Sequence, residues 1–314
     1  PFPQRVLNSF HFDGVFQGLG RVNPHWCRKS LLKVMSERGR LTLNREHVMH
    51  LINNSKLMPE LKEAAKQSVR YSIRICHDPT ESVPIGKSKF GGLPDVPPGF
   101  RWPWVYDTDR HYPAIFVAQI NLKDVSPLDP TGLFPPHGML YFFEGIDDIS
   151  GNFTPVLYHP FDTQLTPAIN PEEDPRFWEY GEFDVLKESI ITFRSEWMLP
   201  PACFDPVHTV LFNMNETQRE HQEEIYYELQ KQILALTPAK NVHRMLGYAD
   251  VNHVTPIEYS QYRNGEKKSW ILLLQVNSDY DILTGDAGSI SFWIDPEALK
   301  ERDFSSAKEI WEQT

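Results

Sequence analysis

The spacing of apolar residues predicts helices in the first seventy residues of the chain. A first helix follows the capping residue Asn23 and ends by Gly39, and a second follows Asn44. A third begins at Pro59, where the missing N–H of proline costs nothing, and runs to Val69. The N-terminal part of the chain is therefore expected to be helical.

Residues 71–77 alternate between apolar and polar positions, which is the period of a β-strand. Further strands are expected over residues 114–122, 138–144, 153–159 and 189–194. The longest helix is expected to follow the cap Asn215 and to reach about Leu236. Its predicted inward stripe consists of Ile225, Leu229, Ile233 and Leu236.

Three short patterns occur twice, in the same order. Residues 92–96, 116–121 and 138–143 correspond to residues 247–251, 272–277 and 288–293. The aspartate of the first pattern precedes the glutamine of the second by 24 residues in one copy (Asp95, Gln119) and by 25 in the other (Asp250, Gln275). Ordered recurrence at near-equal spacing indicates internal duplication. We therefore predict an α+β fold with a duplicated β-rich unit, the repeats covering about 87–145 and 242–296.

Two pairs of amide side chains end the apolar runs of these repeats. Gln119 and Gln275 are expected to be buried, and Asn121 and Asn277 follow two residues later on the same strand face. We favour a structural interpretation, in which the amides hold loop backbone against the sheet. In the functional alternative both pairs line a shared cleft between the repeats and bind a polar ligand.

Two tryptophans in a proline-rich loop are further candidates for binding. Trp102 and Trp104 could stack on a sugar or on a proline-rich peptide. Anchoring of the loop in the core is the interpretation that we favour. The predicted ligand-binding residues are therefore Gln119, Asn121, Gln275, Asn277, Trp102 and Trp104.

Composition narrows the class of protein. Of the 314 residues 40% are hydrophobic and 23% are charged, as in globular proteins. No window approaches the roughly 18 consecutive apolar residues that a membrane span requires. Three cysteines far apart in the sequence do not make a disulfide framework. This indicates an intracellular, reducing compartment, either the cytoplasm or, as the second choice, the mitochondrion.

Charge is divided unequally along the chain. The net charge is -11, but residues 1–70 hold twelve basic and five acidic side chains, a net +7, which leaves -18 for the rest. We favour docking of this basic head onto the acidic body. An external polyanion and a remnant of a targeting region are the alternatives. Nucleic acid is the unlikely partner, because the acidic body would repel a phosphate backbone.

Cysteine chemistry is not favoured by the pattern. In Cys76-His77-Asp78 neighbouring side chains point to opposite faces of a strand and cannot form a relay. A loop could bring Cys203 toward His208, but no activating base or helix N-terminus is evident for the thiol. We therefore predict no catalytic residues.

Metal and cofactor patterns are also incomplete. His47 and His50 have a chelating spacing on the second helix, but no further ligand lies at a matching interval. A calcium-loop register that starts at Asn277 places Ile282 where the invariant glycine belongs and Gly288 where the bidentate glutamate belongs. Neither a dinucleotide-binding nor a phosphate-binding glycine loop occurs. The prediction is no metal and no cofactor.

Several motifs resemble those of the YwqG-like family, a domain family of unknown function. They are SIRI (72–75), KSKFGGLPDVPPGFRWP (87–103), FVAQINL (116–122), GMLYFF (138–143), VLYHP (156–160), LLLQVNSD (272–279), GDAGSISFWI (285–294) and LKERDFSSA (299–307). The resemblance covers about residues 60–314. It implies an α+β fold with internal duplication and an immunity or binding role, and it supplies no catalytic residues. Thr284 departs from the tryptophan often found there, and residues 1–55 look like an addition to the family domain.

Together these observations predict two domains and a binding function. Residues 1–58 form a basic helical N-terminal extension, and residues 59–314 form the YwqG-like domain. We expect a non-catalytic module that binds a protein partner or a ligand, immunity-like or a subunit of a larger assembly. The alternative is a hydrolase that uses Asp and His groups in the cleft between the repeats.

Overall fold

The computed structural model describes residues 45–79, 82–108, 110–145, 148, 150–160, 163–171, 186–236, 243–250, 270–278 and 288–313. The helices in these ranges are α2 (Arg45–Asn54), α3 (Pro59–Gln67), α4 (Leu122–Val125), α5 (Val207–Phe212), α6 (Glu216–Ala235) and α8 (Pro296–Glu301). Short 3₁₀ turns cover Ser126–Leu128 and Phe304–Ser306. The first six strands are β1 (Arg70–Pro79), β2 (Lys89–Phe90), β3 (Asp95–Val96), β4 (Trp104–Asp107), β5 (Arg110–Pro113) and β6 (Ile115–Asn121). The others are β7 (Met139–Glu144), β8 (Val156–His159), β9 (Thr166–Pro167), β10 (Ser189–Met198), β11 (His243–Leu246), β12 (Ile271–Asn277), β13 (Gly288–Ile294) and β14 (Lys308–Gln313).

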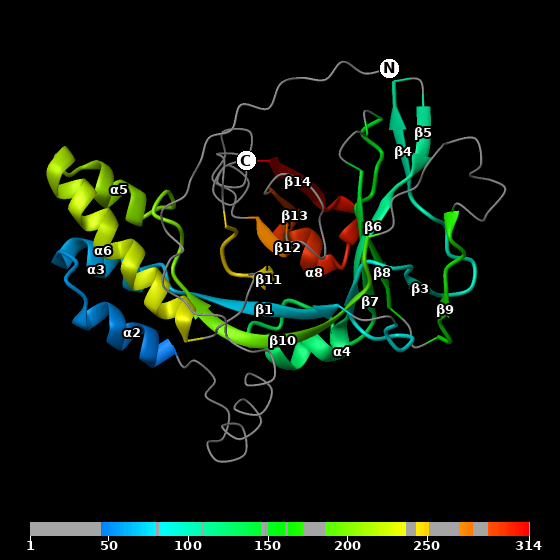
Figure 1. Cartoon of the computed structure of the whole chain (residues 1–314), viewed down its shortest axis with the longest axis horizontal. Helices are drawn as coiled ribbons and strands as arrows, with labels where there is room; N and C mark the ends of the chain where they lie inside the picture. Colours follow the sequence, from blue (N-terminus) through cyan, green and yellow to red (C-terminus); the bar gives the residue numbers. More distant parts are fainter. Residues whose placement is uncertain are drawn as a thin grey trace, which may run out of the picture. The chain divides into compact units, whose positions relative to one another are not determined.

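One large antiparallel sheet organises the described residues (Figure 1). Its strand order is β14-β13-β12-β11-β1-β10-β2-β6-β7-β8. The central pair, β1 and β10, runs from Arg70 opposite Met198 to Pro79 opposite Ser189. A short strand flanks this pair on each side, β11 next to β1 and β2 next to β10, and three further strands follow on each side. The strand order is therefore alike on the two sides of the central pair.

One face of the sheet carries the main core. Ile73 and Ile75 of β1 contribute to it, and Leu122 and Leu299 add apolar surface from α4 and α8. The sheet curls around this core and brings Phe142 on β7 close to Phe292 on β13, with 5.1 Å between ring centroids. Burial of apolar area on this concave face is the main term that stabilises the curl.

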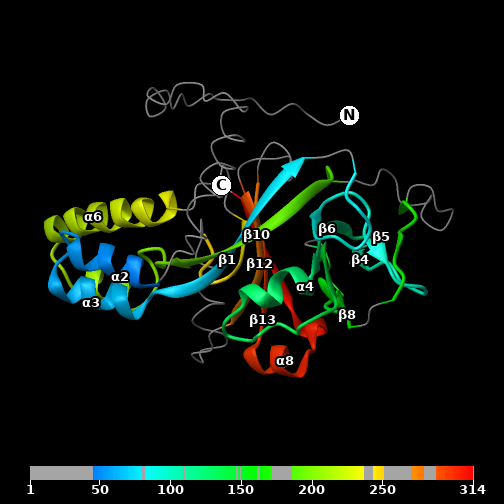
Figure 2. The same ribbon diagram turned by 90° about the horizontal axis from the view of Figure 1, so that it is seen from below.

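A layer of helices packs around a second core beside one end of β1 and β10 (Figures 1 and 2). Helices α2, α3, α5 and α6 all contribute buried residues to it. Helix α3 begins with Pro59, as predicted. The N-terminus of α6 is capped by Asn215, whose Oδ1 accepts the N–H of Gln218 at 3.0 Å, which also confirms the prediction.

The predicted inward stripe of α6 is partly wrong. Leu229 and Ile233 are buried, but Leu236 is 41% exposed, and Gln222 and Tyr226 are buried instead. Both polar residues find partners inside: Gln222 Oε1 accepts the N–H of Met58 at 2.7 Å, and the Tyr226 hydroxyl donates to the carbonyl of Pro200 at 2.9 Å. The buried face of α6 therefore differs from the predicted one, because Gln222 and Tyr226 can be buried when their polar atoms are hydrogen-bonded.

The five strands expected between residues 71 and 194 are all present, as β1, β6, β7, β8 and the first part of β10. The first predicted helix, the cap Asn44 and most of the basic extension lie outside the described residues. None of the helices in the described ranges has the length and apolar character that crossing a lipid bilayer demands.

Candidate functional site

The face of the sheet opposite the main core carries buried charges. Arg74 on β1 and Glu196 on β10 form an ion pair, with 2.6 Å between Nη2 and Oε2 and side chains 2% and 4% exposed. Arg74 lies opposite Arg244 of β11, and Arg244 lies opposite Gln275 of β12. Two buried guanidinium groups are thus neighbours across two strands. Such charges are tolerated in the interior only where they are paired and hydrogen-bonded.

The first polar loop, residues 89–95, is closed by Gln119. This side chain is fully buried, its Oε1 accepts the N–H of Asp95 at 2.7 Å, and its Nε2 donates to the Asp95 carboxylate at 2.7 Å. Lys89, opposite Gln119 in the sheet, places its Nζ 2.7 Å from Glu188 Oε1 and 3.7 Å from Asp95 Oδ1. The Lys89 and Asp95 side chains are 4% and 2% exposed, and that of Glu188 is 20% exposed, so the cation and the aspartate of this loop are buried.

The second polar loop, residues 244–250, is held by Gln275, which binds the backbone of Asp250 at two points. Its Oε1 accepts the N–H of Asp250 at 2.8 Å, and its Nε2 donates to the Asp250 carbonyl at 2.7 Å. Arg244 takes the place of Lys89, with Nη1 3.1 Å from Asp250 Oδ1. Here the aspartate side chain is 46% exposed. The second loop is therefore open where the first is closed.

The two asparagines also hold their own loops. Asn121 Nδ2 donates to the carbonyl of Gly86 at 2.9 Å, and its Oδ1 accepts the N–H of Lys123 at 3.1 Å and caps α4. Asn277 Nδ2 donates to Asp250 Oδ2 at 3.2 Å. These amides hold backbone and side chains of the loops against the sheet.

The structure does not bring the two amide pairs together. Strands β6 and β12 are separated in the sheet by β11, β1, β10 and β2. Gln119 and Gln275 are each adjacent in sequence to a residue of the main core, Ala118 and Leu274, so both amides point to the face away from the contact between β7 and β13. Their role as ligand-binding residues stays a prediction.

The two tryptophans occupy the β4–β5 region. Trp102 packs against a third apolar cluster that contains Phe143, with 5.5 Å between ring centroids, and its Nε1 donates to the carbonyl of Ala114 at 2.8 Å. Trp104 lies beside His111, with 5.6 Å between ring centroids. Through these contacts both tryptophans pack against neighbouring residues of the protein, as expected for anchoring of the loop.

The cysteine candidates lack activation. Burial raises the pKa of the Cys76 thiol and of the Cys203 thiol, which disfavours the nucleophilic thiolate. The Asp205 carboxylate accepts the hydroxyl of Thr209 at 2.6 Å. His208 lies beside Phe212, with 5.8 Å between ring centroids. These contacts indicate local structure.

The described residues contain no group of three or more His, Cys, Asp or Glu side chains that could hold a metal ion. His47 and His50 are exposed on α2, where His50 Nε2 lies 2.9 Å from Asn54 Nδ2. The calcium-loop residues 279–287 lie outside the described part of the chain.

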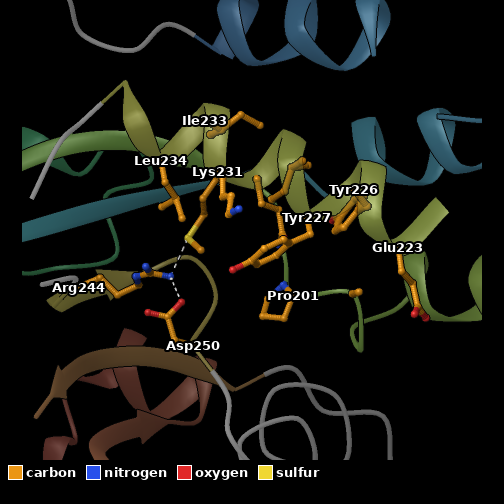
Figure 3. A pocket seen from close by; sticks show the side chains of 13 residues that line it. Pro201, Glu223, Tyr226, Tyr227, Lys231, Ile233, Leu234, Arg244 and Asp250 are labelled. Carbon is orange, nitrogen blue, oxygen red and sulfur yellow. Dashed lines mark hydrogen bonds and ion pairs between the residues drawn. The ribbon is translucent and has the colours of Figure 1, made fainter. Parts of the chain in front are cut away.

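A pocket of about 500 Å³ opens between α6 and the second polar loop (Figure 3). Its polar lining is Glu223, Tyr226, Tyr227, Gln230, Lys231, Arg244 and Asp250, and its apolar lining is Met198, Leu199, Pro201, Ala202, Ile233 and Leu234. Figure 3 shows Arg244 and Asp250 meeting below α6, with Leu234 and Lys231 on that side and Glu223 at the far end. The volume lies in the range of small-molecule sites.

The charged groups at the pocket are held by specific partners. Arg244 pairs with Asp250, and Lys231 Nζ lies 2.7 Å from Glu228, a hydrogen bond that raises the pKa of the lysine. Burial raises the pKa of Tyr226, so its hydroxyl stays protonated and donates to Pro200. The pocket thus offers donors, a guanidinium and apolar walls.

Sequence reasoning did not find this pocket. Asp250 lies within the repeated pattern, residues 92–96 and 247–251, but the basic residue that precedes each aspartate lies before the pattern begins. Lys89 and Arg244 both lie six residues before the aspartate. A basic residue at the same interval before both aspartates is the sequence signal that points to this site.

Fold and site define a protein of mixed helix and strand, built on a curled antiparallel sheet with buried charges on its outer face. Residues 88–312, more than half of the chain, match a family described as a domain of unknown function (DUF1963). The chain belongs to this family. No curated protein matches the chain.

Proposed function

We propose that the chain is a non-catalytic binding module and that the pocket between α6 and the second polar loop is its ligand site. The observation that carries the proposal is a buried guanidinium, that of Arg244, in the wall of a pocket of about 500 Å³. Pockets of this kind, mostly apolar with a few fixed polar groups, are typical of small-molecule sites.

The chemistry of the pocket favours binding over hydrolysis, which is the alternative. A hydrolase needs an acid or base whose pKa is matched to proton transfer near neutral pH. At this pocket Asp250 holds Arg244, Lys231 is bonded to Glu228, and the raised pKa of Tyr226 keeps it protonated. Asp250, Lys231 and Tyr226 are thus engaged in hydrogen bonds or ion pairs, which favours binding over proton transfer.

An internal duplication of a YwqG-like domain, residues 59–314, forms part of the proposal. The repeats of about 87–145 and 242–296 each contain a basic residue opposite a buried glutamine, and that glutamine accepts the N–H of an aspartate six residues after the basic one. Each also has an irregular register two residues before the glutamine, in the pairings β6–β7 and β12–β13. In family members, Lys or Arg, Asp and Gln of both copies are expected to persist together.

The wider role also remains a proposal. A protein partner, an immunity-like role or membership of a larger assembly, and an intracellular reducing compartment follow from the sequence, with residues 1–58 as a basic docking extension. Purification from the native source tests the partner, and elution alone at monomer mass would count against it. Deletion of residues 1–44, which keeps α2 and its buried Val48 and Ile52, should leave the fold intact and remove the partner if the extension is the docking arm.

The ligand site is tested by blocking the pocket. A fragment library would be screened by thermal shift and ligand-observed NMR against the full chain and against Leu234→Trp, which adds bulk to the pocket wall. Ala235→Trp is the matched control, because Ala235 is exposed on the same helix and is not among the lining residues. Fragments should bind the wild type and the control, and lose binding in Leu234→Trp. Hits that bind all three proteins equally would refute the pocket as the site.

A further inference from the structure

The two polar loops differ in the number of carboxylates around the buried cation. Lys89 has two, with its Nζ 2.7 Å from Glu188 and 3.7 Å from Asp95. Among the described residues Arg244 has one, Asp250, at 3.1 Å. The cationic side chains are 4% and 1% exposed. The second loop therefore has one negative charge fewer around an equally buried cation.

The missing carboxylate has a defined position. Glu188 lies beside Gly92, where an added Cβ would be 3.0 Å from its Oε1. The residue beside Gly247 is Ser72, whose Cβ would be 2.8 Å from an added Cβ. Ser72 carries no charge, and its hydroxyl donates to the carbonyl of Met245 at 3.4 Å. The second loop has a short neutral side chain where the first has a carboxylate.

One nitrogen of the Arg244 guanidinium, Nε, makes no hydrogen bond within the described residues. Its contacts within the described residues are made by Nη1, to Asp250 Oδ1, to the carbonyl of Tyr248 at 2.9 Å and to Met198 Sδ at 3.6 Å. The buried Nε has no hydrogen-bond partner in that part of the chain. On a guanidinium, Nε and Nη2 are parallel donors whose spacing fits the two oxygens of a carboxylate. A buried donor left without an acceptor is costly, so an acceptor here is strongly favoured.

The surroundings favour a single negative charge. Arg74 lies opposite Arg244 across the strands and adds positive potential, which Glu196 offsets. Asp250 lines the pocket next to Arg244, and Glu223 lies at the far end (Figure 3). Two carboxylates in one pocket would repel a dianion such as phosphate, whereas a monoanion paired directly with the guanidinium is tolerated.

We propose that the pocket binds a small monocarboxylate with an apolar body. Its carboxylate pairs with the guanidinium of Arg244, which lines the pocket, and gives the second loop the charge that Glu188 gives the first. Its apolar part lies against Met198, Ile233 and Leu234, which line the same pocket. The inference rests on the proposed function, because it names the ligand class of that site.

The test compares matched probes on the full wild-type chain by calorimetry and NMR. Phenylacetate is the carboxylate probe, phenylacetamide is its neutral isostere, phenethylamine is the cation and inorganic phosphate is the dianion. Phenylacetate should bind at least about tenfold more tightly than the other three. Phenylacetamide and phenethylamine lack the anionic acceptor, and phosphate is repelled by the two carboxylates of the pocket and has no apolar body. It should also shift the Nε–H resonance of Arg244.

Two variants separate the guanidinium from charge alone. Arg244→Lys keeps the charge and loses the fork, so it should weaken phenylacetate binding by about tenfold or more. Lys300→Met, at an exposed cation that does not line the pocket, is the control and should change binding by no more than about twofold. Ser72→Glu introduces the carboxylate of the first loop and should abolish binding. Its fold is checked by circular dichroism.

Each outcome decides the inference, even if Ser72→Glu fails to fold, since the wild-type comparison needs no variant. Equal binding of phenylacetamide and phenylacetate, or unchanged binding in Arg244→Lys, would refute recognition of a carboxylate by Arg244. The proposed ligand site would still stand. Tighter binding of phosphate than of phenylacetate would refute the preference of the pocket for a monoanion. Failure of phenylacetate to bind overturns the inference, and fragment hits that ignore Leu234→Trp overturn the proposed function as well.

Discussion

Gln119 closes the first polar loop by binding the same residue twice: its Oε1 accepts the backbone N–H of Asp95, and its Nε2 donates to the Asp95 carboxylate, both at 2.7 Å. In the second loop Gln275 binds Asp250 through the N–H and the carbonyl, at 2.8 and 2.7 Å. Both glutamines are fully buried. A primary amide suits this position because it offers a donor and an acceptor from one end.

Replacement of either glutamine by leucine should therefore destabilise the protein. Gln119→Leu leaves the buried N–H of Asp95 without an acceptor and should lower the free energy of unfolding by about 2–3 kcal/mol, as should Gln275→Leu. Gln232→Leu, at an exposed position of α6, should change it by less than about 0.5 kcal/mol. Urea denaturation measures all three. Equal effects at buried and exposed sites would contradict this account.

The strands and the capped helix were predictable because they depend on local period and capping chemistry. The strand at 114–122 and the cap Asn215 follow from residues that are close in sequence. The face of α6 was not predictable, since the burial of Gln222 depends on Met58, 164 residues away. The same applies to the pocket: Arg244 and Asp250 come from one loop, but α6 closes the space above them.

The buried ion pair between Arg74 and Glu196 gives the second prediction. Arg74→Met leaves an uncompensated carboxylate in the interior and should cost about 3–5 kcal/mol of stability, whereas Arg74→Met/Glu196→Leu should recover most of it. Lys300→Met is the control for an exposed pair, because Lys300 and Glu297 lie 2.7 Å apart with side chains 65% and 75% exposed. Its cost should stay below about 1 kcal/mol. A double-mutant cycle by denaturation measures the coupling, and additive effects would show that the pair is not coupled.

Tyr71 gives a prediction at high pH. Its hydroxyl donates to the carbonyl of Leu128, and burial raises its pKa to about 12. Because the folded pKa lies above the unfolded value of roughly 10, the contribution of this group to stability is complete below pH 10 and is lost as pH rises toward 12. Burial also raises the pKa of Tyr141 and of Tyr226.

Absorbance near 295 nm, followed together with circular dichroism, tests this behaviour. The folded protein should retain a set of tyrosines that do not ionise by pH 11, and all tyrosines should ionise near pH 10 in denaturant. Tyr71→Phe should remove part of the signal above pH 11 and reduce the loss of stability between pH 10 and 12. Ionisation of every tyrosine by pH 11 with the fold intact would disprove the assignment.

Gly247 gives the last prediction, because two constraints act there at once. Its φ of +72° is left-handed, and an added Cβ would lie 2.8 Å from Ser72 Cβ and 2.8 Å from Met198 Sδ. Gly132 shares the left-handed backbone, with φ of +66°, but nothing lies within 4 Å of an added Cβ. Gly132→Ala therefore measures the backbone cost alone, about 1 kcal/mol.

Gly247→Ala should lower the free energy of unfolding by about 1–3 kcal/mol more than Gly132→Ala does, which is the usual penalty of overpacking. Met198 can turn its thioether away, but Ser72 belongs to β1 and is opposite Leu246, so its Cβ cannot retreat without opening the pairing of β1 with β11. Gly247→Ala/Ser72→Gly removes that contact and should recover part of the loss. Thermal and urea unfolding of the four proteins decide the matter: if the two alanine variants are equally stable, the loop moves freely on β1 and the position of Ser72 cannot set the charge of the pocket.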